Sequence, residues 1–221
     1  MSDTVNDYWR ELTPAEIAAG RHREFVGGLW NEIGALQFDF LRAQGLTPAD
    51  ALLDVGCGAL RGGVHFVRYL DRGGYCGLDV NASLLEAGRQ ELGDALLRDK
   101  SPQLVVSADF GFAAFGRRFR YALAVSVFTH LDMNRIVLCL ARMREVLAPD
   151  GRFFASWFEA PHAACMAPQD HAAGIRTYYV HDPFHYAYGE MQAMAALAGM
   201  SVERIGDWGH PRGQRMLCFR A

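Results

Sequence analysis

The sequence lacks several patterns that define common protein classes. No apolar run approaches the roughly 20 residues that span a bilayer, and residues 1–10 lack the apolar segment of a secretory signal. The net charge is only −3, so no strong field attracts nucleic acid or an anionic membrane. We therefore expect a cytoplasmic protein without nucleic-acid or membrane partners. The sequence leaves monomer and homodimer open.

Paired cysteines are also missing. The five cysteines are scattered and form no C-x-x-C pair, which argues against zinc ribbons and disulfide frameworks. A group of possible metal ligands does occur late in the chain, at spacings that match no common site: His162, Cys165, His171, His181 and His185. We therefore predict no metal.

What is present is typical of a globular α/β protein. The 221 residues are 51% hydrophobic, enough for one structural domain with a real core. Helical patterns are expected at 13–44, 60–70, 84–97, 134–147 and 190–197. Strand patterns are expected at 51–55, 75–79, 103–106, 121–127, 152–158, 201–205 and 215–219. Alternating strands and helices indicate right-handed crossovers and a mainly parallel sheet.

Two segments depart from this alternation. The last two strands are joined by about ten residues, which is short for a parallel crossover, so we expect them to pair antiparallel. Residues 159–188 have poor periodicity and are rich in His, Tyr and Pro, which predicts a long functional loop or lid. The predicted organisation is a helical cap at 1–45 followed by one ligand-binding domain at 46–221.

A glycine-rich turn follows the first strand, where a doubly wound sheet binds its ligand. The G-x-G-x-x-G dinucleotide pattern fails because Arg61 occupies the third glycine position, and no Gly-Lys-Ser/Thr of a P-loop occurs. Asp54 precedes the glycines and suits a ligand with an ammonium group. Asp79, at the end of the second strand, can accept hydrogen bonds from ribose hydroxyls. Asp109, beside Phe110, suits an adenine amino group and ring edge.

These motifs resemble the class I S-adenosylmethionine-dependent methyltransferases. The resemblance covers roughly residues 46–158 and is carried by the runs Leu53–Gly58, Gly77–Asp79, Ser107–Asp109, Val125–Leu131 and Leu147–Gly151. It implies a Rossmann-like, doubly wound, seven-stranded sheet with an antiparallel last strand and an N-terminal helical extension. It also implies S-adenosylmethionine as cofactor.

The resemblance implies a cofactor role for several residues. Asp54 binds the ammonium, Gly56 and Gly58 lie against the methionine part, and Asp79 holds the ribose. Val80, Asp109, Phe110 and the Ser126 carbonyl complete the site: Val80 packs on adenine, Asp109 and Phe110 meet its amino group and edge, and the carbonyl meets the ammonium. The family's frequent third glycine is Leu60 here, and Arg61 is our candidate for the cofactor carboxylate.

Methyl transfer from a sulfonium is an in-line displacement that requires alignment more than acid–base chemistry, and no strict catalytic signature is expected. We predict His185 as a general base, ahead of His181, with His162 and Glu159 as alternatives. We predict that His130 positions the loop after the fourth strand. Substrate contacts are expected from Trp9, Trp157, Glu159 and Tyr186, and from a second polar cluster at 207–214.

The sequence thus predicts a methyltransferase acting on oxygen or nitrogen of a small-molecule acceptor. The alternative is a non-catalytic S-adenosylmethionine-binding module that acts as a regulatory partner. The aromatic and histidine-rich lid favours the enzyme.

Overall fold

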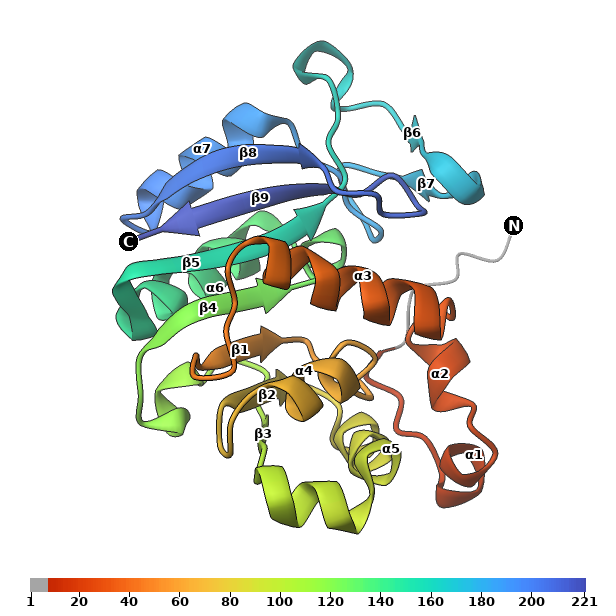
Figure 1. The fold of residues 1–221 in the computed structure, drawn as a ribbon. Helices are drawn as coiled ribbons and strands as arrows, with labels where there is room; N and C mark the ends of the chain where they lie inside the picture. Colours follow the sequence, from red (N-terminus) through yellow and green to blue (C-terminus); the bar gives the residue numbers. More distant parts are fainter. Residues whose placement is uncertain (1–7) are drawn as a thin grey trace.

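A seven-stranded sheet runs through the molecule in the order β3-β2-β1-β4-β5-β9-β8 (Figure 1). The computed structural model describes residues 8–221. The strands are β1 (Leu52–Val55), β2 (Tyr75–Asp79), β3 (Gln103–Val106), β4 (Phe119–Ala124), β5 (Leu147–Trp157), β8 (Ser201–Asp207) and β9 (Arg215–Arg220). The first five pair in parallel, and β9 pairs antiparallel with both β5 and β8. This confirms the predicted Rossmann-like fold.

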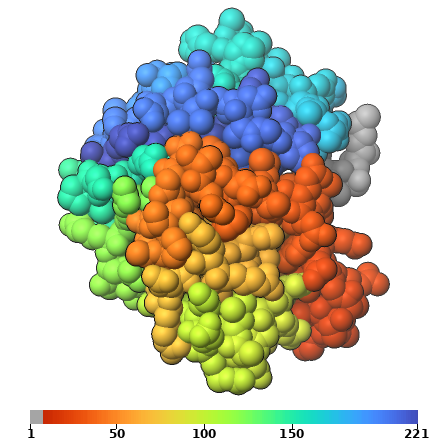
Figure 2. All heavy atoms as spheres, viewed as in Figure 1, coloured from red at the N-terminus to blue at the C-terminus, as the bar shows by residue number. Residues whose placement is uncertain are grey.

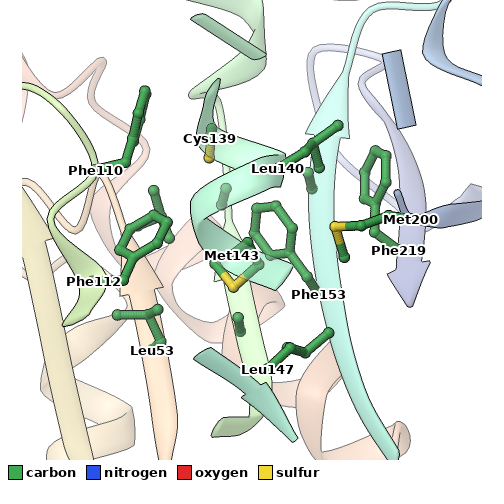
Figure 3. Close-up of a cluster of buried hydrophobic side chains, with 14 of the residues drawn as sticks. Leu53, Phe110, Phe112, Cys139, Leu140, Met143, Leu147, Phe153, Met200 and Phe219 are labelled. Atoms are coloured by element: carbon green, nitrogen blue, oxygen red, sulfur yellow. The ribbon is translucent and has the colours of Figure 1, made fainter. Parts of the chain in front are cut away.

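Helices cover both faces of the sheet and bury two separate sets of side chains. One face packs α3 (Trp30–Ala43), α4 (Gly63–Tyr69) and α5 (Ala82–Lys100), and the other packs α6 (Met133–Val146) and α7 (Tyr188–Leu197). Successive strand residues point to opposite faces. Leu52 therefore joins the core under α3 and α4, whereas Leu53 joins the core under α6. Figure 3 shows Leu140 and Met143 of α6 in this second core, near Phe153 of β5.

The N-terminal helix is broken into three, so the prediction of one helix over 13–44 is wrong. The pieces are α1 (Pro14–Ala18), α2 (His22–Phe25) and α3. Glycines with positive φ stand in the breaks: Gly20 at +74°, Gly27 at +93° and Gly28 at +63°. Figure 2 shows this red and orange segment against the gold region of α4 and the blue C-terminal region. The Phe40 ring packs 5.5 Å from that of Trp208, centroid to centroid, which joins α3 to the loop before β9.

The lid, residues 159–188, lies at the carboxyl-terminal ends of the parallel strands, on the same side of the molecule as α1 and α2 (Figure 1). It holds a two-stranded sheet of β6 (Gln169–Asp170) and β7 (Arg176–Thr177). Short 3-10 turns occur at η3 (His162–Ala164) and η4 (Ala172–Gly174), and elsewhere at η1 (Phe112–Phe115) and η2 (Phe128–His130). Within residues 8–221, no helix has the length and hydropathy needed to span a bilayer.

Candidate active site

A cavity of about 400 Å³ opens at the carboxyl ends of β1, β2 and β4. The strand order reverses between β1 and β4, and such a reversal is the usual ligand site of an open α/β sheet. All the predicted cofactor residues except Asp109 line this cavity: Asp54, Gly56, Gly58, Arg61, Asp79, Val80, Phe110 and Ser126. The cavity also receives side chains that sequence reasoning did not assign to the site, including Val26, Gln37 and Arg135.

The glycine turn brings the backbone to the cavity wall. Gly56 and Gly58 have φ values of +65° and +54°, which side chains disfavour. A Cβ atom on Gly56 would lie 2.5 Å from Cγ2 of Val127, so no larger residue fits. The turn therefore leaves space and exposed backbone for a ligand, as a bound S-adenosylmethionine requires.

Leu60 stands where the family often has a glycine, and it adopts the left-handed backbone conformation that favours glycine. Its φ is +65°, and its side chain is fully buried. That side chain occupies the space beside Gly63 and Gly88, where an added Cβ would lie 2.8 and 2.6 Å from Leu60 atoms. Leu60 thus keeps the backbone turn of the family, and its side chain fills the space between α4 and α5.

Asp79 is held rigidly at the end of β2. Its Oδ2 accepts a hydrogen bond from the Gly58 amide at 2.8 Å, and its Oδ1 accepts one from the Asn81 amide at 2.9 Å. Burial raises the pKa of this carboxyl, while the backbone donors oppose the rise. A buried carboxylate with both oxygens fixed is suited to a pair of ribose hydroxyls.

Asp54 is a buried carboxyl without a cationic side chain bonded to it. Its Oδ2 accepts a hydrogen bond from the Tyr75 hydroxyl at 2.7 Å. Burial raises the pKa of Asp54 to about 7, and the charge of Asp79 adds to the rise. Such a group gains most from a ligand that brings a positive charge. The ammonium of S-adenosylmethionine supplies one.

Arg61 is the predicted partner of the cofactor carboxylate. Its guanidinium is buried and lines the cavity, and Nη1 donates to the carbonyls of Val26 at 3.1 Å and Gly28 at 2.9 Å. Burial lowers its pKa to about 10, so it stays cationic at neutral pH. These contacts with neutral backbone carbonyls fix the guanidinium in place without neutralising its positive charge, which remains available to a ligand carboxylate.

Asp109 is not brought to the cavity. Its Oδ1 accepts a hydrogen bond from the Ser107 hydroxyl at 2.7 Å, and the side chain is exposed. Ser107 and Phe110 line the cavity in its place. The geometry therefore does not support the predicted contact of the Asp109 carboxylate with adenine.

Of the predicted substrate residues, only Trp9 lines the cavity, and it is 61% exposed. Trp157 is fully buried in the core under α6 and α7. Glu159 is ion-paired with Arg204, with Oε1 and Nη2 2.6 Å apart. Tyr186 is buried and donates its hydroxyl to the Leu131 carbonyl at 2.6 Å. The geometry argues against substrate contacts by these three.

The two predicted bases also lie away from the cavity. His185 is fully buried, and both ring nitrogens have partners 2.7 Å away, Nδ1 at the Thr177 hydroxyl and Nε2 at the Cys165 carbonyl. His181 is exposed, contacts the Tyr178 ring at a tilt of 31° with centroids 4.0 Å apart, and does not line the cavity. Neither position supports a role as the base, because neither reaches the place of a substrate proton.

The histidine that lines the cavity is His130, in the turn after β4. Its Nδ1 lies 2.6 Å from Oδ1 of Asp182, a lid residue that also lines the cavity. A carboxylate only accepts hydrogen bonds, so Nδ1 carries the hydrogen and Nε2 of the neutral ring is left with a lone pair. The Tyr8 ring packs edge-on against the His130 ring, with centroids 4.9 Å apart. No sequence signal paired Asp182 with His130, because the two residues lie 52 positions apart.

Within residues 8–221, no group of three or more His, Cys, Asp or Glu side chains is arranged to hold a metal ion.

Comparison with known proteins agrees with this geometry. Residues 53–153 match the model of a methyltransferase domain family. DesVI of Streptomyces venezuelae is 20% identical, with 96% of this chain and 99% of that chain covered at a TM-score of 0.64. The CcbJ methyltransferase from Streptomyces caelestis is 16% identical, covering 85% and 89%, also at 0.64. The glycopeptide N-methyltransferase MtfA, complexed with S-adenosylmethionine, is 19% identical, covering 85% and 93% at 0.62. At these identities the likeness shows a shared fold.

Proposed function

The chain carries a methyltransferase domain, residues 53–153, within the class I fold of S-adenosylmethionine-dependent methyltransferases, and on that premise we propose that it methylates oxygen or nitrogen of a small-molecule acceptor. S-adenosylmethionine supplies the methyl group, already activated on a sulfonium. The protein then has to bind the cofactor and the acceptor, align them for transfer, and exclude water from the site.

The charged side chains around the cavity support the proposal that the protein binds S-adenosylmethionine. Asp79 meets the ribose, Asp54 meets the ammonium, and Arg61 meets the carboxylate. All three side chains are less than one-tenth exposed, so their interactions are weakly screened by solvent. Tyr8 and Trp9, together with the lid residue Asp182, line the same cavity and restrict the space left for an acceptor. A cavity of about 400 Å³ that must also hold the cofactor favours a small acceptor over a macromolecular surface.

The observation that carries the choice of acceptor is the His130–Asp182 pair. A hydroxyl or a protonated amine must lose a proton when it is methylated, and a histidine oriented by a carboxylate is suited to take it. We assign His130 as the base, with Asp182 fixing its tautomer, in place of His185 and His181. A module that only binds the cofactor has no use for such a pair at its cavity.

The test is a two-step assay on the purified protein. Calorimetry first measures binding of S-adenosylmethionine and its demethylated product, S-adenosylhomocysteine. The protein is then incubated with methyl-labelled S-adenosylmethionine and separate panels of small alcohols, phenols, amines and carboxylates, and in parallel with mixtures of proteins and of nucleic acids. Transfer is followed by mass spectrometry. Failure to bind either nucleoside contradicts the methyltransferase activity. Binding with transfer only to proteins or nucleic acids contradicts the small-molecule acceptor.

A further inference from the structure

The polar cluster at 207–214, in the connection between β8 and β9, does not line the cavity. It stands behind the cavity and contacts residues that do. The Gln214 side chain is 3% exposed and reaches Ser126, which lies on the cavity wall just after β4. The Gln214 backbone is fixed as well, because its carbonyl accepts a hydrogen bond from Nε1 of the buried Trp208 at 3.0 Å. Gln214 is therefore a fixed polar residue that contacts the cavity wall at Ser126 without lining the cavity itself.

Three side chains form a closed hydrogen-bond network here. The Ser126 amide donates to the Ser156 hydroxyl at 2.7 Å, and that hydroxyl donates to Oε1 of Gln214 at 2.5 Å. Nε2 of Gln214 donates back to the Ser126 hydroxyl at 3.0 Å. Ser156 is fully buried at the end of β5. The network therefore joins the ends of β4 and β5 to the loop that leads into β9.

Ser126 has an unusual backbone conformation. Its φ is +59°, in the left-handed region that residues with a side chain rarely adopt. Such a conformation persists only where the surrounding contacts impose it, and such residues gather at functional sites. The three hydrogen bonds of the network hold both the amide and the side chain of Ser126.

We propose that Gln214 and Ser156 are positioning residues that hold Ser126 in its left-handed conformation and thereby set the affinity for the amino-acid end of the cofactor. The inference rests on the proposed function. β4 and β2 flank β1 on opposite sides, so Ser126 and Asp79 lie on opposite sides of Asp54. The network acts on the ligand end near Asp54 and Ser126, and the ribose end at Asp79 is independent of it.

The experiment measures binding of two probes, S-adenosylhomocysteine and adenosine, by calorimetry. Gln214→Met removes the hydrogen bonds of Gln214 to Ser156 and Ser126 with little change in side-chain volume. We expect it to bind S-adenosylhomocysteine about tenfold more weakly than wild type, the loss of one or two hydrogen bonds. We expect its adenosine affinity to stay unchanged, because adenosine lacks the amino-acid end. Gln44→Met is the matched control: Gln44 also accepts a side-chain hydrogen bond, from Arg152 at 3.1 Å, but lies away from the cavity.

A second pair of variants tests the backbone strain directly and does not disturb a buried residue. Ser126→Ala and Ser126→Gly both lose the hydroxyl contact with Gln214, but only glycine adopts positive φ without cost. We expect Ser126→Gly to bind S-adenosylhomocysteine several-fold more tightly than Ser126→Ala. We also expect Gln214→Met to cost less affinity when it is combined with Ser126→Gly than in the wild-type background.

The inference is overturned if Gln214→Met and Ser126→Ala keep the wild-type affinity for S-adenosylhomocysteine. It is also overturned if adenosine affinity falls as much as that of S-adenosylhomocysteine, since that indicates general damage to the site. Wild-type protein that binds neither probe contradicts the proposed function instead, so the two failures are distinct.

Discussion

Cofactor affinity should depend on pH through Asp54. The carboxyl is 5% exposed, and burial raises its pKa to about 7. In the protein without ligand it is therefore mostly protonated at pH 6 and mostly ionised at pH 7.5. A ligand ammonium is attracted by the ionised form, so binding below pH 7 must first remove a proton. The affinity consequently falls as the pH falls through 7.

The pKa of about 7 sets the size of the effect. The ionised fraction changes from about one-tenth at pH 6 to about three-quarters at pH 7.5, which predicts binding of S-adenosylhomocysteine about eightfold weaker at pH 6. Calorimetry in two buffers of different ionisation enthalpy should also detect proton release on binding at pH 6. Adenosine is the control ligand: it lacks the ammonium, so its binding should not share the pH dependence that Asp54 gives to S-adenosylhomocysteine.

The Tyr75 hydroxyl supplies a second perturbation of the same group. Its hydrogen bond to Asp54 opposes the effect of burial, so Tyr75→Phe should raise the pKa of Asp54 further. The midpoint of the affinity profile then moves to higher pH. Asp54→Asn should bind weakly at every pH and lose the dependence. Equal affinity for S-adenosylhomocysteine at pH 6 and 7.5 in the wild type would refute the assignment of Asp54 to the ammonium.

Three further predictions concern the rest of the site. Asp79→Ala should weaken S-adenosylmethionine binding by about 1–3 kcal/mol, the cost of unpaired ribose hydroxyls, and an unchanged calorimetric affinity contradicts the ribose contact. Asp182→Ala should lower turnover about 10²-fold and shift the His130 tautomer seen by ¹⁵N NMR, whereas Asp170→Ala in the same lid should change neither. Amide exchange of residues 160–182 should be fast without ligand and slow when cofactor and acceptor are both bound; equal protection rules out gating.

The first three strands were predictable because they are short apolar runs, and a glycine turn follows β1 while Asp79 ends β2. β1, β2 and β3 lie within a residue of their expected bounds, and so do the ends that carry Asp54 and Asp79. The predictions for β4 and β5 were less accurate, since these strands begin at Phe119 and Leu147 instead of at 121 and 152.

The three separate N-terminal helices were not predicted, because the helix start signal at Thr13–Pro14 and the hydrophobic spacing from Leu29 onward were joined into one helix across Gly20, Gly27 and Gly28. Periodicity alone does not register a backbone that leaves the helix at a glycine with positive φ.

The errors in the site follow from the direction in which single side chains point. Ser156 and Trp157 are neighbours at the end of β5, and the period of two sends them to opposite faces of the sheet. Ser156 joins the Ser126–Gln214 network, whereas Trp157 enters the core under α6. The sequence marked the end of β5 correctly as a region near the site. It gave no means to choose the smaller residue over the aromatic one.

The contacts of the lid histidines could not be predicted from the sequence either, because their partners lie several to many residues away along the chain. His185 Nε2 must donate to the Cys165 carbonyl, so its Nδ1 accepts from the Thr177 hydroxyl, and that hydroxyl in turn accepts from Nε2 of His171 at 2.8 Å. The chain of hydrogen bonds has one consistent direction and ties three parts of the lid together. Two more bonds attach the lid to the turn that bears His130: the Phe184 amide donates to the Thr129 carbonyl, and the Tyr186 hydroxyl donates to the Leu131 carbonyl. His185 is thus part of the hydrogen-bond network of the lid, and Asp182, which contacts His130, lies three residues before it. We expect this network to stabilise the part of the lid from which Asp182 reaches His130, so the predicted base His185 has a structural position in the lid.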